Sequence, residues 1–241
     1  MKAVLLNSGI GKRLESLTAD KPKCLVELID GKTILGEQLA AITRVNITQA
    51  VITTGPFASH IHHYVQQHFP NLQVEYIHNP NYAQTNYIYS LYLAESALAT
   101  DVLVMHGDLV FGKGVLELLL ADPALNAALV NPSLPLPEKD FKAREVSGNI
   151  IEIGVNVWGE NCSFLAPCYK LTSAVMQHWM KEIKNFVNRG ETSVYAENGF
   201  NVILPQVGLK PVRFDGLFCS EIDNLKDLEK VRSYLQDEFT R

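Results

Sequence analysis

Short apolar runs alternate with segments of helical periodicity over the first half of the chain. The helical segments occupy residues 33–45, 58–69, 86–98 and 115–122, and the apolar runs around them occupy residues 2–7, 49–54, 72–78, 101–108 and 126–131. Buried parallel strands covered by helices have this pattern, because each crossover between parallel strands needs a helix. The alternation therefore predicts an α/β fold with a mostly parallel central sheet.

The pattern changes after Pro132. A proline-rich connection over residues 132–140 leads to two strand-like runs, 140–146 and 149–157, that flank Ser147-Gly148. A two-residue turn of this kind predicts a β-hairpin, so we expect a small antiparallel elaboration on the substrate side. Two further helices are predicted, one over residues 171–190 that ends on Gly190, and one over 224–239 with an apolar stripe of Leu225, Leu228, Val231 and Leu235.

Composition limits the classes of partner. The 241 residues are 47% hydrophobic, which is enough for one compact domain over residues 1–241. The net charge is -5 without a long basic run, so neither a nucleic acid nor a membrane surface is expected as a partner. The four cysteines lack CxxC spacing and the N-terminus lacks a signal-peptide pattern, so we expect a cytoplasmic protein with reduced thiols. A homodimer is left open.

A loop rich in glycine and basic residues, NSGIGKRLESLTADKPK, follows the first apolar run. Glycines at this place let backbone N–H groups approach an anion closely. The loop is neither a dinucleotide fingerprint, because Leu14 stands where the third glycine belongs, nor a Walker loop, because Gly-Lys-Ser/Thr is absent. Its cations suit a triphosphate, and the alternative is a solvated basic turn.

The order of strand, GxGxRL and xLTxxxPKxLVxL resembles the signature of nucleotidyltransferases of the sugar-nucleotide pyrophosphorylase superfamily. Downstream, HNPNYAQTNYIYSLYLAES resembles a segment of the small phosphocholine cytidylyltransferases, and DVLVMHGDLVF and CSEIDNLKDLEKV resemble two further family elements. The resemblance implies a Rossmann-like α/β/α sandwich. It also implies transfer of a nucleotide from a nucleoside triphosphate to a phosphorylated small molecule, with release of pyrophosphate.

Two aspartates are the candidate Mg²⁺ ligands. Asp108 and Asp223 each end an apolar run, and Mg²⁺ typically uses one or two carboxylates together with substrate phosphates. The alternative for Asp223 is that it caps the helix that follows. Both positions match the family, so the resemblance implies a metal role, with Lys23 on the α-phosphate and Arg13 on the β- and γ-phosphates as catalytic residues.

The resemblance also implies the substrate pockets. The predicted nucleotide contacts are Leu6, Asn7, Ser8, Gly9, Gly11, Lys12, Gly55, Thr85, Asn86 and Ser90. Relatives usually have two alanines in place of Asn7 and Ser8. The predicted acceptor contacts are Lys142, with Lys139 and Arg144 as alternatives for the same role, and Tyr195, Glu197 and Asn198. A solvent-facing carboxylate is the alternative for Glu197.

These observations favour transfer of CMP from CTP to a small phosphate or phosphonate of the phosphocholine or 2-aminoethylphosphonate type. The first alternative is a sugar-1-phosphate nucleotidyltransferase that uses UTP or dTTP, although such enzymes often add a C-terminal domain or long insertions. The second is a nucleotide-binding regulatory protein without turnover. Other histidines are discounted: His60, His62 and His63 lack the partners of a zinc site, and His106 is interpreted as a packed strand residue.

Overall fold

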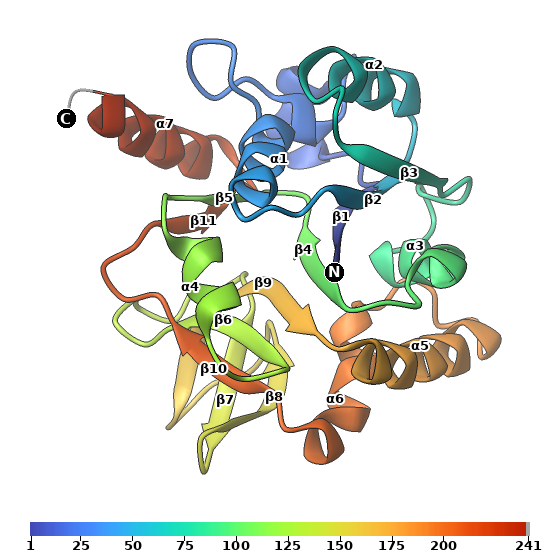
Figure 1. Ribbon diagram of the computed structural model, residues 1–241, viewed down its shortest axis with the longest axis vertical. Coiled ribbons are helices and arrows are strands. Elements are labelled where there is room, and N and C mark those ends of the chain that lie inside the picture. The colour runs from blue at the N-terminus through green and yellow to red at the C-terminus, as the bar shows by residue number, and fades with distance from the viewer. Residues whose placement is uncertain (240–241) are drawn as a thin grey trace.

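A nine-stranded sheet forms the centre of the molecule (Figure 1), and the computed structural model describes residues 1–239, without the side chains of Lys12, Glu15 and Phe239. The main path of the sheet is β10-β6-β9-β4-β1-β2-β3, and β7 and β8 extend it from β9. The strands of this sheet are β1 (Lys2–Asn7), β2 (Gln49–Thr54), β3 (Gln73–His78), β4 (Val102–His106), β6 (Ala127–Asn131), β7 (Lys142–Val146), β8 (Asn149–Gly154), β9 (Cys162–Leu171) and β10 (Lys210–Arg213).

Strands β1 to β4 are parallel neighbours, as the alternation predicts. In the register of the sheet, Leu6 of β1 is paired with Thr53 of β2 on one side and with His106 of β4 on the other. The carboxyl ends of these three strands therefore meet at one edge, where open α/β sheets bind their ligands.

Helices cover both faces of the sheet. Because side chains alternate along a strand, Val4 and Leu6 pack into one core cluster while Ala3 and Leu5 pack into the other. The first face is covered by α3 (Tyr87–Leu93), α5 (Ser173–Asn188) and α6 (Ala196–Val207), and the second by α1 (Ile34–Arg44), α2 (Ala58–His68) and α4 (Val115–Ala121). The fold is a three-layer α/β/α arrangement, and the expected fold class is confirmed.

A second, two-stranded sheet lies beside the main one. It pairs β5 (Leu109–Phe111) with β11 (Cys219–Glu221) in antiparallel fashion, with Glu221 opposite Leu109. Helix α7 (Leu225–Phe239) follows and packs Leu228, Val231 and Leu235 into a third core cluster. The fourth residue of the predicted stripe, Leu225, is 49% exposed because it lies in the first turn, before the helix reaches that cluster.

The antiparallel elaboration forms as predicted. Strands β7 and β8 pair across Ser147-Gly148, and both residues have positive φ, as a tight hairpin turn requires. The long helix α5 ends at Asn188, and Gly190 follows in the left-handed conformation. The predicted helix over residues 86–98 is instead divided, because α3 ends at Leu93 and a short 3-10 turn, η3 (Glu95–Ala97), follows.

The basic loop folds into two 3-10 turns, η1 (Lys12–Thr18) and η2 (Lys23–Leu25). Within the described residues, no helix has the length and apolar character needed to cross a membrane.

Candidate active site

A pocket of about 360 Å³ opens at the carboxyl ends of β1 and β4. Thirteen of the predicted site residues line it: Leu6, Asn7, Ser8, Gly9, Gly11, Arg13, Lys23, Thr85, Asn86, Ser90, Asp108, Tyr195 and Asp223. The fold thus brings together residues from the first 23 positions, from the start of α3, from the turn after β4, from the residue before α6 and from the segment after β11.

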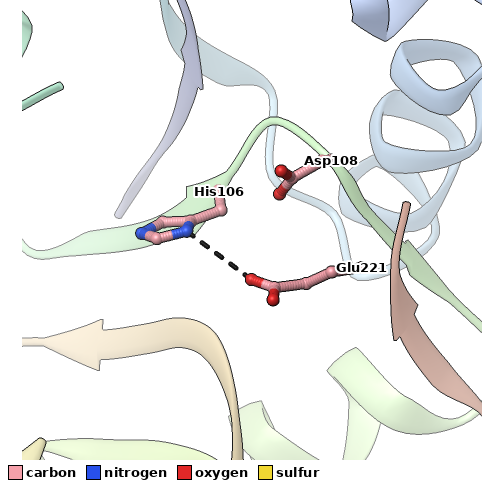
Figure 2. Close-up of side chains that lie close together, drawn as sticks. All are labelled: His106, Asp108 and Glu221. Atoms are coloured by element: carbon pink, nitrogen blue, oxygen red, sulfur yellow. Dashed lines mark ion pairs between the residues drawn. The ribbon is translucent and has the colours of Figure 1, made fainter. Parts of the chain in front are cut away.

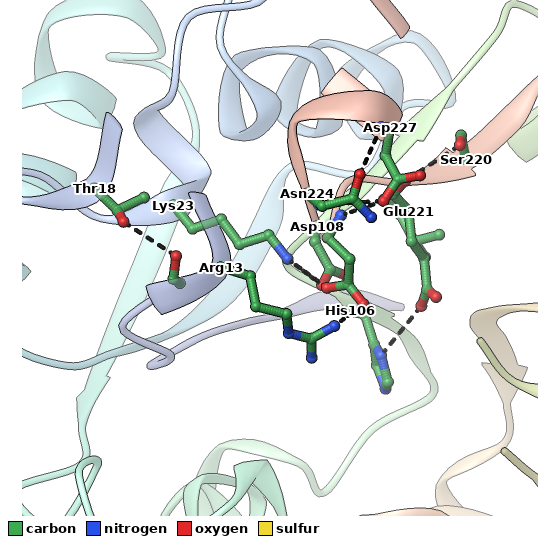
Figure 3. A network of polar contacts seen from close by, with 12 residues as sticks. Arg13, Thr18, Lys23, His106, Asp108, Ser220, Glu221, Asn224 and Asp227 are labelled. Atoms are coloured by element: carbon green, nitrogen blue, oxygen red, sulfur yellow. Dashed lines mark hydrogen bonds and ion pairs between the residues drawn. The ribbon is translucent and has the colours of Figure 1, made fainter. Parts of the chain in front are cut away.

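Two parts of the basic loop, the turn at Gly11 and the segment around Thr18 and Lys23, pack against each other. Gly11 has φ +72°, and a Cβ there would lie 2.7 Å from Cβ of Lys23, so only glycine fits both the backbone and the space. The hydroxyl of Thr18 donates a hydrogen bond to the Gly11 carbonyl at 3.0 Å (Figure 3). These contacts hold the turn at Gly11 against Cβ of Lys23.

Lys23 joins the two predicted metal ligands. Its ammonium lies 2.8 Å from Oδ2 of Asp108 and 3.0 Å from Oδ1 of Asp223, and Arg13 contacts Oδ2 of Asp223 at 2.5 Å. Burial alone lowers the pKa of Lys23, but the carboxylates of Asp108 and Asp223 outweigh it and raise the pKa above its ordinary value. The pKa of Asp108 is lowered: burial opposes ionisation, and the Lys23 charge overcomes it. Lys23 and Asp108 are therefore both ionised at neutral pH.

Asp223 is not the cap of α7. Oδ1 of Asn224 accepts hydrogen bonds from the backbone N–H groups of Lys226 and Asp227, and the Asp227 carboxylate accepts from the N–H groups of Asp223 and Asn224. This reciprocal capping satisfies the helix start (Figure 3) and leaves the Asp223 carboxylate to face Lys23 and Arg13.

A second acidic group lies next to Asp108. Ligand atoms of His106, Asp108 and Glu221 lie within 4.8 Å of one another, and Figure 2 shows the three side chains converging from the end of β4 and from β11. Oδ1 of Asp108 is buried without a hydrogen-bond partner among the described residues, and burial raises the pKa of Glu221 to about 7. Carboxylate oxygens are hard donors, and the unpartnered Oδ1 of Asp108 fits a divalent cation such as Mg²⁺.

Polar side chains from three elements form a hydrogen-bonded network in the pocket. Ser8 Oγ lies 3.1 Å from Thr53 Oγ1 and 2.6 Å from Ser90 Oγ, and Asn79 Nδ2 donates to Ser90 at 3.0 Å and to Thr85 at 3.1 Å. The hydroxyl of Ser8 therefore ties the end of β1 to β2 and to α3. An alanine at position 8 would lack both contacts.

Asn7 lies beside this network. Its backbone N–H donates to Thr53 Oγ1 at 3.0 Å, and its side chain rests against Gly107, where an added Cβ would lie 2.1 Å from Oδ1 of Asn7. Nδ2 of Asn7 is buried and has no hydrogen-bond partner in the described part of the chain. A buried donor without a partner is costly, so it points to an acceptor that a ligand supplies.

Four aromatic rings, called here the aromatic wall, line the pocket: Tyr87, His106, Phe141 and Tyr195. Their ring centroids form a closed circuit, with separations of 4.6 Å for Tyr87 and His106, 5.5 Å for His106 and Phe141, 5.1 Å for Phe141 and Tyr195, and 6.0 Å for Tyr195 and Tyr87. Sequence analysis missed three of these residues. The NYIYSL segment contains Tyr87, but nothing in the sequence indicates which of its tyrosines faces the pocket.

Glu197 lies behind the aromatic wall, only 1% exposed. The hydroxyls of Tyr87 and Tyr169 both donate to its carboxylate, and His106 Nε2 lies 3.2 Å from Oε1. Burial opposes ionisation, and these partners nevertheless lower the pKa of Glu197. The solvent-facing alternative for Glu197 is therefore wrong. His106 is a buried residue of β4, as interpreted, and its ring also lines the pocket and pairs with Glu197.

Four predicted residues, Glu197 among them, are absent from the pocket lining within the described residues. Asn198 is exposed on α6, and Lys142 is fully buried. Gly55 packs against the backbone of Ser8, since a Cβ at Gly55 would lie 2.3 Å from the Ser8 carbonyl oxygen. The side chain of Lys12 lies outside the described part of the chain. Residues that sequence analysis did not select, Asn79, Tyr82, Gly107 and Glu221 among them, complete the lining.

The chain is similar to known nucleotidyltransferases. The chain is 31% identical over 137 residues to the CMP-5'-(3-aminopropyl)phosphonate synthase of Streptomyces rubellomurinus, a match that covers 56% of this chain and only 22% of that protein. It is 24% identical to the choline-phosphate cytidylyltransferase of Streptococcus pneumoniae, over 99% of this chain and 100% of that one. Another cytidylyltransferase and sugar-phosphate nucleotidyltransferases are also among the similar proteins.

The fold has a matching solved structure. The CTP:phosphocholine cytidylyltransferase from Streptococcus pneumoniae superposes with a TM-score of 0.80 at 19% identity, over 97% of this chain and 98% of that chain. Residues 3–134 of the 241 match the family of the MobA-like NTP transferase domain. The resemblance found in the sequence is therefore confirmed. The chain belongs to the MobA-like NTP transferase domain family and is a nucleotidyltransferase.

Proposed function

We propose that the protein transfers CMP from CTP to a small phosphate or phosphonate that carries a cationic amine, and that it releases pyrophosphate. The observation that carries this proposal is the composition of the pocket. Its lining combines the cation and carboxylate cluster of Lys23, Arg13, Asp108 and Asp223 with the aromatic wall. The first group suits reacting phosphates, and the second suits an amine.

The reaction brings two anions together. Two unit charges about 4 Å apart repel by roughly 4 kcal/mol at an effective dielectric of about 20. Lys23 and Arg13 offset this repulsion, with Lys23 on the phosphorus under attack and Arg13 on the departing pyrophosphate. The acceptor oxygen is already ionised near neutral pH, since the second phosphate pKa is about 6, so the reaction needs no general base.

Mg²⁺ would be held by Asp108, with Asp223 or Glu221 as the second carboxylate, and would supply charge neutralisation for the phosphates when bound. Oδ1 of Asp108, which is buried and unpartnered among the described residues, is the oxygen best placed for this role. Lys23 must leave the carboxylates to meet the α-phosphate, because its ammonium lies between them in the free protein.

The nucleoside would occupy the polar network of Asn7, Ser8, Thr85 and Ser90. Their donors and hydroxyls match the ring and carbonyl acceptors of a pyrimidine and the hydroxyls of a ribose. The amine of the acceptor would lie against the aromatic wall, where cation–π attraction amounts to about 0.5–2 kcal/mol. Glu197 acts through Tyr87, because its carboxylate accepts a hydrogen bond from the Tyr87 hydroxyl and so holds this ring in the wall.

A pyrophosphate-release assay tests the proposal. The protein is incubated with Mg²⁺, with each of the four NTPs, and with a panel of phosphocholine, aminoalkylphosphonates and sugar 1-phosphates. Release that depends on CTP and on an amine-bearing acceptor is the expected result. Release only with UTP or dTTP and a sugar phosphate would contradict the proposal and would support the sugar-1-phosphate nucleotidyltransferase alternative. No release with any pair, from protein that binds nucleotide, would favour a regulatory protein without turnover.

A further inference from the structure

Lys142 is a fully buried lysine whose ammonium is committed within the protein. Nζ donates hydrogen bonds to the carbonyl oxygens of Pro137 at 2.6 Å and of Asp140 at 3.1 Å, and it lies 4.1 Å from the ring centroid of Trp158. Burial lowers its pKa, and the Asp140 charge opposes that effect. Two carbonyls and an aromatic face occupy the positions that an acceptor phosphate would need.

The two carbonyls lie on either side of Lys139 in the chain. They belong to the proline-rich connection between β6 and β7, which has no strand or helix of its own to fix its shape. The connection reaches the active site, because Lys139 and Phe141 both line the pocket. The same lining contains Asp108 and Asp223, so the connection lies beside the carboxylate cluster; burial, followed by the charges of Asp223, Asp227 and Asp108, raises the pKa of Asp140.

The two other candidate cations, Lys139 and Arg144, differ in whether they line the pocket and in whether they have a partner. Lys139 is exposed and lines the pocket, and the structure gives its ammonium no partner among the described residues. Arg144, the other alternative considered for this role, donates to Glu152 at 2.9 Å and to the Trp158 carbonyl at 3.0 Å, and it is absent from the lining. Of the three candidate cations, Lys139 alone is both in the pocket and uncommitted.

We infer that Lys139 contacts the acceptor phosphate or phosphonate, and that Lys142 is a positioning residue that holds the connection by the carbonyls of Pro137 and Asp140. The inference rests on the proposed function, since it takes the acceptor to be a phosphate or phosphonate. It assigns specificity for the acceptor to a residue of the connection rather than to the hairpin strand β7. We call Lys142 and the two carbonyls that it binds the clamp. Trp158, from the segment after β8, packs against the Lys142 ammonium and stabilises this clamp.

The test compares Lys139→Met, Lys142→Met and a control, Lys181→Met, which removes an exposed lysine of α5. Affinity for inorganic phosphate is measured by titration calorimetry, so that the readout does not depend on finding the natural acceptor. Protease cleavage within residues 132–141 reports the shape of the connection, and acrylamide quenching of Trp158 fluorescence reports the clamp. Trp179 is 1% exposed and adds little to the quenching.

Lys139→Met should weaken phosphate binding by about 10-fold or more, the effect of losing a charge-assisted contact, with the connection and Trp158 unchanged. Lys142→Met should weaken it similarly and also expose the connection to protease and alter the quenching of Trp158. Lys181→Met should match wild type in all three. In the transferase assay, the KM for the acceptor should rise in both variants while the KM for the nucleotide stays within about 2-fold.

Two results would overturn the inference. Phosphate affinity within about 2-fold of wild type in Lys139→Met would remove Lys139 from the acceptor site. Loss of phosphate binding in Lys142→Met with an unchanged connection would make Lys142 the direct contact. Lys139→Met changes an exposed side chain, so it keeps the test decisive even if Lys142→Met fails to fold. Failure of the proposed function is distinct, since it would show as absent pyrophosphate release while phosphate binding still separates the variants.

Discussion

The ammonium of Lys23 lies 2.8 Å from Oδ2 of Asp108, so a residue assigned to the α-phosphate neutralises a residue assigned to the metal. The pair is mostly buried, with side-chain exposures of 16% and 23%. Lys23 therefore occupies the position next to Asp108 that a metal ion and a phosphate would take in the proposed reaction.

Lys23→Met should uncouple metal binding from nucleotide binding. Without the competing ammonium, Asp108 and Asp223 lack a buried cation, and we expect the variant to bind Mn²⁺ about 10-fold more tightly than wild type in the absence of nucleotide. Titration followed by electron paramagnetic resonance measures this directly. Turnover should fall by about 10²–10³-fold, because the stabiliser of the reacting phosphate is lost. Lys181→Met is the matched control, and unchanged metal affinity in Lys23→Met would contradict the competition.

Asp108→Asn should separate turnover from binding. The amide keeps the size of the side chain but loses the charge that a metal needs, so kcat should fall by about 10²–10³-fold while metal-free nucleotide affinity changes by less than about 3-fold. Steady-state kinetics and calorimetry with EDTA measure the two quantities. Turnover close to wild type would show that Asp108 is not a metal ligand.

Asn7→Ala should weaken nucleotide binding without loss of stability. One hydrogen bond from its unpartnered amide contributes about 1 kcal/mol, so the KM for the nucleotide should rise roughly 5-fold. Removal of a buried donor that lacks a partner in the free protein should leave Tm unchanged or slightly raised. Comparison of CTP with UTP shows whether Asn7 reads the base, and a fall in Tm with unchanged KM would make its role structural.

Gly55→Ala should act through the backbone of Ser8. The new Cβ would lie 2.3 Å from the Ser8 carbonyl oxygen, so the end of β1 must shift, at a cost of about 1–3 kcal/mol in the free energy of unfolding. Gly9→Ala is the control for stability, since a Cβ there meets no atom within 4 Å. Urea denaturation measures both variants. Equal stability of the two would contradict the close approach seen here.

Cys162 should be the reactive cysteine among the four. Burial raises the pKa of Cys24 to about 12, and it raises the pKa of Cys168 and Cys219 as well, so these thiols stay protonated and covered at pH 8. Cys162 is partly exposed at the start of β9. A thiol reagent should modify one cysteine rapidly in the native protein and none rapidly in Cys162→Ser. Rapid modification of Cys24 would show that the pocket opens around it.

The parallel strands and the site at their carboxyl ends were predictable because they depend on local pattern. Apolar runs such as residues 2–7 and 49–54 are long and regular, and a loop after a parallel strand can lie only at one edge of the sheet. The pattern therefore predicts that Lys23 and Asp108 lie at the same edge of the sheet, and in the structure the Lys23 ammonium lies 2.8 Å from Oδ2 of Asp108.

Strand β9 was not predicted. It contains Pro167, which disfavours a central strand, yet β9 lies between β4 and β6. The register explains the exception, since the pairing with β6 shifts between Ala128 and Leu129 and leaves Pro167 at the irregularity. Only the assembled sheet supplies that information.

The hydrogen-bond partners of Lys142 and Glu197 could not be predicted from the sequence either. A lysine two residues after Asp140 matches a family position, but only the fold shows that its ammonium turns inward to two carbonyls. Glu197 likewise becomes a buried anion because Tyr87, His106 and Tyr169, from three different elements, meet around it.

The antiparallel course of β9 has a consequence for how such a protein can diversify. Residues 3–134, which the family match spans, hold β1 to β6 and the polar network, whereas β7 and β8 lie outside it, pair with the sheet at β9 and bond α6 through Ile153 and Asn201. The turn at Ser147-Gly148, at the far end of this hairpin, can change in length or sequence while the register of β1 with β4 stays the same. Lys139, the acceptor contact proposed above, also lies outside the matched residues, so it can vary independently of the nucleotide site.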